Sequence, residues 1–97
     1  MASIMTLSLD QLAGMWFSDD KQFTLWIRKE QERIEVYYNR KVVLSEPICF
    51  YYDEVNNICK VSESVTVFQL HDSNDQKIVF WINTDDYETE QWFNKRQ

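Results

Sequence analysis

The side chains that could support acid–base or nucleophilic chemistry are few, and His71 is the only histidine of the chain. A histidine that acts as a general base needs a nucleophile within reach and a carboxylate that orients its ring. Asp72 follows His71 directly, and neighbouring residues of a strand point to opposite faces of the sheet. We therefore expect an exposed imidazole at a strand end, and the sequence predicts that the protein is not an enzyme.

Metal and cofactor chemistry has equally little support. One histidine and two cysteines cannot build a zinc site of several histidine ligands within one chain, and a single glycine excludes glycine-rich phosphate loops. Paired carboxylates do occur, but without the spacing of an EF-hand loop. These pairs are Asp19-Asp20, Asp53-Glu54 and Asp85-Asp86. We interpret them as solvated turns, with loose calcium binding as the alternative, and predict no cofactor and no metal.

Cys49 and Cys59 are too few for a disulfide framework. If a turn is centred on Glu54, strand register places the two cysteines opposite each other, where they could form a redox-sensitive pair. A turn at Asn56-Asn57 breaks that pairing. Two unpaired thiols and a redox switch therefore both remain open.

The overall charge bears on the partner and the compartment. The 97 residues carry a net charge of −6 at pH 7, which opposes binding to nucleic acid because a binder needs a basic face. Residues near the start lack both a basic segment and an unbroken apolar run, and no other run is long enough to span a membrane. We predict a cytoplasmic protein without nucleic-acid or membrane partners.

The sequence pattern predicts that any site is positioned by β-strands. Five segments alternate apolar and other side chains with a period of two, which is typical of strands with one buried face. Short polar breaks rich in Asn and Asp separate them, and these residues can replace glycine in turns. The alternating segments are residues 23–28, 34–38, 48–53, 65–70 and 78–82. This rhythm predicts an all-β fold.

Short connections leave no room for crossover helices, so neighbouring strands should pair antiparallel in a meander. Closing the sheet removes its exposed edges. We predict one domain over residues 1–97: a small, closed or nearly closed antiparallel barrel of about eight strands. Residues 1–12 form an N-terminal arm with a short helical turn, where Ser8 and Gln11 form a capping box. Residues 87–96 suit either a last strand or a short helix, and we favour the strand.

A local motif connects these elements to a known family. The segment Leu12-Ala13-Gly14-Met15-Trp16 resembles the start of lipocalin-like barrels, where a helical turn leads into Gly-x-Trp at the first strand. The chain is also similar to small lipocalin-like domains of unknown function from Bacteroidetes, which implies a bacterial protein. The resemblance implies that Trp16 closes the base of the barrel and that Arg96, or Lys95, packs across it. A closing meander would bring Gly14 and Trp16 close to Trp92 and Arg96.

The aromatic residues are the most suggestive feature, at 15% of the chain. Several lie on the face opposite the most regular apolar alternation, namely Trp26, Tyr37, Tyr51, Phe68 and Trp81. Strands buried on both faces would explain them, as would a dimer contact. Tyr and Trp are also enriched at protein interfaces.

Two functions follow from this pattern. The first is a non-enzymatic binding protein whose aromatic face engages a protein partner or a second copy, with an inhibitor, immunity or counter-defence protein as a variant. The alternative is a carrier or sponge for a small apolar or nucleotide-like molecule in the barrel mouth. For an anionic ligand the candidate donors are Arg28, Arg33, Arg40 and Lys41.

Overall fold

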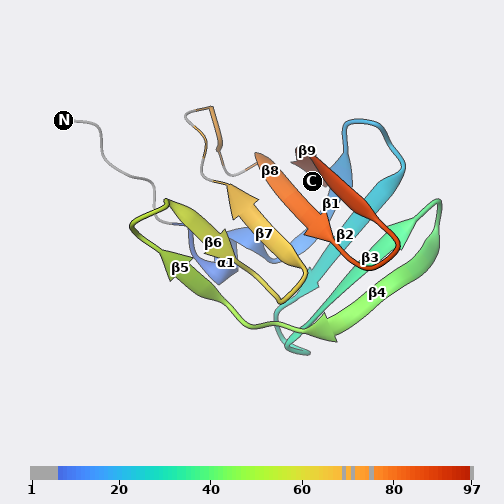
Figure 1. Ribbon diagram of the computed structural model, residues 1–97, viewed down its shortest axis with the longest axis horizontal. Helices are drawn as coiled ribbons and strands as arrows, with labels where there is room; N and C mark the ends of the chain where they lie inside the picture. Colours follow the sequence, from blue (N-terminus) through green and yellow to red (C-terminus); the bar gives the residue numbers. More distant parts are fainter. Residues whose placement is uncertain (1–6, 69, 71, 75, 97) are drawn as a thin grey trace.

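A computed structural model describes residues 7–68, 70, 72–74 and 76–96; His71 lies outside them. Within this part the chain is all-β, with one helical turn before an antiparallel meander of nine strands (Figure 1). The elements are α1 (Leu9–Leu12), β1 (Gly14–Ser18), β2 (Phe23–Arg28), β3 (Arg33–Tyr38), β4 (Lys41–Pro47), β5 (Tyr51–Asp53), β6 (Ile58–Lys60), β7 (Val65–Phe68), β8 (Lys77–Asn83) and β9 (Glu88–Lys95). The all-β prediction is confirmed.

The sheet curls because its first and last strands pair. The strand order is β4-β3-β2-β1-β9-β8-β7-β6-β5, and Trp16 of β1 lies opposite Lys95 of β9. The C-terminal segment is thus a strand, as favoured from the sequence. In the described residues the two edges are β4 and β5, which follow each other in the chain without pairing. The result is a half-barrel, open between these strands (Figure 1).

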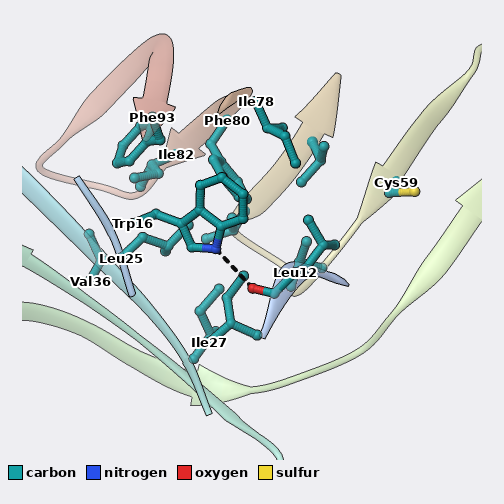
Figure 2. Packing of buried hydrophobic residues seen from close by; sticks show 14 of the residues in the cluster. Leu12, Trp16, Leu25, Ile27, Val36, Cys59, Ile78, Phe80, Ile82 and Phe93 are labelled. Carbon is teal, nitrogen blue, oxygen red and sulfur yellow. Dashed lines mark hydrogen bonds between the residues drawn. The ribbon is translucent and has the colours of Figure 1, made fainter. Parts of the chain in front are cut away.

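The predicted alternation fills the inside of the half-barrel. On β2, for example, Phe23, Leu25 and Ile27 are buried while the residues between them are half-buried. The rings of Trp16 and Phe93 each meet Phe80 edge to face, at centroid distances of 5.2 and 5.3 Å. Leu7 and Leu12 add their side chains from the N-terminal arm. Figure 2 shows Leu12 beside Trp16 within this cluster.

The N-terminal arm has the predicted capping box. Ser8 Oγ accepts from the Gln11 N–H, and the Gln11 side chain accepts from the Ser8 N–H. A helix this short is marginal by itself. The burial of Leu7 and Leu12 therefore stabilises it against the sheet.

Backbone and side-chain bonds cross the opening between β4 and β5. The Ile48 N–H donates to Glu32 O and the Cys49 N–H to Val61 O. Glu46 near the end of β4 accepts from the N–H and the hydroxyl of Ser64, at 2.8 and 3.1 Å. The connecting segment thus ties the two halves of the sheet although their edge strands do not pair.

Both edges carry features that oppose pairing with another strand. β4 begins at Lys41, ends at Pro47 and contains a register shift opposite Val36 and Tyr37, while β5 has only three residues. Charge, proline, bulges and short length are known protections of edge strands. The exposed edges therefore do not by themselves indicate assembly.

The register of the β5–β6 hairpin settles the cysteine question. Cys59 lies opposite Tyr52, so the turn is shifted away from the position that would bring the cysteines together. Cys49 is exposed in the connecting segment and Cys59 is buried in the core, without a disulfide between them. The redox pair does not form because this register places Tyr52, and not Cys49, opposite Cys59.

Candidate functional site

The aromatic residues predicted on the second face of the sheet form two groups, and the first lies on β2 and β3. The Arg28 guanidinium stacks 4.3 Å from the centre of the Trp26 ring and contacts Glu35 at 3.4 Å. Tyr37 donates to the same Glu35 oxygen. Burial, and then the negative charge of Glu35, raise the pKa of Tyr37. The tyrosine is therefore neutral and serves as a hydrogen-bond donor.

The second group lies on β7, β8 and β9. The rings of Phe68 and Trp81 lie 6.4 Å apart. Val79 sits in register between Phe68 on one side and Trp92 on the other, and only 5% of it is exposed. Because flat rings on both neighbouring strands cover it, this valine is buried on the outer face. The Lys77 ammonium lies 5.5 Å from the Trp92 ring.

β1 connects the two groups. Met15 lies opposite Trp26, while Phe17 lies opposite Asn94 of β9. The Arg96 guanidinium lies 5.9 Å from the Phe17 ring. Three rings of this face therefore have a cation near them. Met15, Phe17 and Lys77 were not predicted on this face, although the alternation around Trp16 and Phe80 indicates it.

Tyr51 stands apart from both groups. It lies on the edge strand β5, separated from the strand of Trp81 by β6 and β7, and is 63% exposed. The predicted aromatic face is thus brought together at Trp26 with Tyr37 and at Phe68 with Trp81.

The four candidate anion donors do not converge. Arg28 and Arg33 lie opposite each other at one end of the β2–β3 hairpin, and Arg33 donates to Ser45 Oγ. Arg40 and Lys41 follow the other end of β3. A strand rises about 3.3 Å per residue, so the two pairs lie about 20 Å apart. They do not form a single anion site.

The residues that were predicted to meet where the barrel closes do not all lie together. Trp16 is fully buried and donates from Nε1 to Leu12 O at 2.9 Å (Figure 2). The Lys95 ammonium lies 5.6 Å from the Trp16 ring. Lys95 also donates to Gln11 O. Of the two cations that the sequence left open, Lys95 is the one beside Trp16. Arg96 lies over Phe17, and Trp92 belongs to the outer face.

Gly14 lies two residues before Trp16, at a position where a side chain would be unfavourable. Its φ is +122°, and a Cβ there would lie 3.2 Å from Cε of Lys95. The glycine thus lets the backbone bend into β1 and lets the lysine stem pass close to it.

Open pockets border the half-barrel. One of about 410 Å³ lies beside Trp26, Gly14 and the β2–β3 turn. Another, of about 300 Å³, lies at the opening, lined by Leu9, Ile48 and Phe50 with Lys29 and Glu32 at its rim. Lys29 forms an ion pair with Asp10, which reduces its availability for an anion.

The described ranges contain no cluster of three or more residues suited to binding a metal ion. No helix in this part of the chain has the length and apolar character to cross a bilayer. Comparison with protein-family models, with curated proteins and with solved structures finds no match.

Proposed function

We propose that this protein is a non-enzymatic binding protein, a small acidic lipocalin-like barrel that engages a protein partner or its own copy through the outer aromatic face. An inhibitor, immunity or counter-defence role is the variant that such small binding proteins suggest. The observation that carries the proposal is the arrangement of Trp26, Phe17, Trp92 and Trp81 on neighbouring strands, outside the packed core. Trp, Tyr and Arg are the residues that contribute most to protein interfaces.

The lipocalin-like relationship is part of the same proposal. The sequence Gly14-Met15-Trp16, with Lys95 across the indole, supports it. The cytoplasmic location and the lack of nucleic-acid partners remain expectations that rest on the sequence and its charge.

A small-ligand carrier is the second candidate. The pocket at the opening, with apolar Leu9, Ile48 and Phe50, has about the minimum volume of small-molecule sites. The inner face of the half-barrel is occupied by the rings of Trp16, Phe80 and Phe93, so a ligand would be held at the rim. This favours the interface over the carrier.

A photo-crosslinking experiment tests the proposal. A benzophenone amino acid replaces Trp81 in cells of the source organism, and adducts are compared with those from the same substitution at Glu54, in a turn. We expect a discrete protein adduct from position 81 that Trp26→Glu weakens while the circular-dichroism spectrum stays that of a β protein. The proposal is wrong if both positions give the same adducts and purified protein stays monomeric in light scattering.

A further inference from the structure

The outer face is not uniform in charge: Glu90 lies opposite Trp81, while cations lie beside the other rings. We define the basic aromatic patch as the rings of Phe17, Trp26 and Trp92, the cations Arg28, Arg33, Lys77 and Arg96, and the carboxylates Glu35 and Asp19, the latter bonded to Asn94. These residues carry a net charge of +2. Because the whole chain carries −6, the rest of the chain carries −8.

The patch is continuous across five strands. Lys77 lies opposite Asn94, which lies opposite Phe17. The Arg96 N–H donates to Met15 O, and Met15 lies opposite Trp26. Arg28 then lies opposite Arg33. Strands are spaced about 4.8 Å apart, so the patch is about 20 Å wide, a span that about six extended residues cover.

The cations keep donors for a ligand. A guanidinium that stacks on a ring leaves its in-plane N–H groups pointing sideways, where carboxylates bind them in bidentate fashion. Arg28 uses one terminal nitrogen for Glu35 at 3.4 Å, and Arg96 is exposed. The stacking also limits the freedom of these long side chains, which reduces the entropy lost on binding.

We propose that the basic aromatic patch binds an extended acidic segment of a partner protein, which deepens and rests on the proposed function. Carboxylates of the segment pair with Arg28, Arg33, Lys77 and Arg96, and its apolar side chains pack on the rings between them. The −8 elsewhere repels such a segment only weakly, because charges farther apart than about 8 Å are screened at physiological salt. The contacts at the patch are shorter than that distance.

The test uses a fluorescein-labelled, unstructured peptide rich in Glu with two spaced Tyr residues, measured by fluorescence anisotropy against the full chain. A peptide with Lys in place of Glu is the charge control. We expect the Glu peptide to bind, the Lys peptide not to bind, and affinity to fall as salt is raised. Arg96→Gln combined with Lys77→Gln should weaken binding by about tenfold.

The matched variant is Lys21→Gln combined with Arg40→Gln, which removes the same charge from exposed turns away from the patch. It should leave the affinity within about twofold. Equal loss in both double variants, or no binding of the Glu peptide, would overturn the proposal. Tighter binding of single-stranded DNA of equal charge would overturn it in favour of nucleic acid, and a patch-dependent dimer in light scattering would assign the face to a second copy. If the peptide fails while the crosslink at position 81 succeeds, only this inference is wrong.

Discussion

Trp16 and Lys95 meet at the pairing that joins the first strand of the sheet to the last. They are cross-strand partners, the ammonium lies 5.6 Å from the indole, and each donates a hydrogen bond to the end of α1, Trp16 to Leu12 O and Lys95 to Gln11 O. The two side chains therefore hold three segments together: the N-terminal arm, β1 and β9.

Two replacements of Trp16 separate the contribution of its hydrogen bond from that of its packing in the core. Trp16→Phe keeps most of the packing but leaves Leu12 O without its donor, which should cost about 1–3 kcal/mol of unfolding free energy. Trp16→Ala also leaves a cavity and should cost about 3–5 kcal/mol. Urea unfolding followed by circular dichroism measures both. The view that Trp16 centres the core would be contradicted if the alanine variant unfolds at the same urea concentration as the wild type.

Gly14→Ala should destabilise the protein by about 1–3 kcal/mol, because a φ of +122° strains any residue with a Cβ. The nearby Cε of Lys95 adds a steric cost. A double-mutant cycle with Lys95→Ala divides the two effects: the strain persists in the Lys95→Ala background and the steric cost disappears. A Gly14→Ala variant of wild-type stability would show that the turn into β1 tolerates a side chain.

Glu46→Ala should loosen the opening of the half-barrel. It removes both hydrogen bonds to Ser64, and the loss should be about 1 kcal/mol for this partly exposed group. Amide hydrogen exchange should accelerate at Ser64. Glu63→Ala, at the exposed neighbouring position, is the control, and equal effects of the two variants would contradict the role of Glu46.

Acid should remove the contribution that the ionised Asp20 carboxylate makes to the stability of the fold. Burial raises the pKa of this carboxyl, but hydrogen bonds from Ser18, the Gln22 N–H and Gln91 lower it to a value below the ordinary one. A lowered folded-state pKa stabilises the fold above the unfolded value of about 3.9, and the contribution is lost as the pH falls through the folded value. Asp20→Asn should therefore reduce stability at neutral pH and reduce its dependence on pH below about 4. Urea midpoints across this pH range measure the effect, with Asp86→Asn as control; parallel curves for wild type and Asp20→Asn would contradict it.

The two cysteines should react at different rates. Cys49 is exposed and Cys59 is fully buried, so a thiol reagent such as Ellman's should modify Cys49 in the native protein and Cys59 only on unfolding. Cys49→Ser should abolish the fast reaction. A fast reaction that persists in Cys49→Ser would show that β6 opens readily in the native state.

The sequence by itself determined the strand elements and their inner face. Alternation at Phe23, Leu25 and Ile27 has a period of two, and a strand must place such residues on one side. The same alternation placed Trp26 and Trp81 away from the core. The three-residue spacing of Ser8 and Gln11 predicted the capping box. These features depend on contacts between residues near in sequence.

The tertiary structure decided what depends on register and curvature. The position of the β5–β6 turn separated Cys49 from Cys59. A turn displaced by a few residues would have changed which residue lies opposite Cys59. Pairing of β1 with β9 selected Lys95 over Arg96 as the neighbour of Trp16. The approach of Lys77 and Arg96 to the aromatic face arises from strands far apart in the chain. Only the curled sheet brings those cations together, so the charge of the patch could not be inferred from the net charge of the sequence.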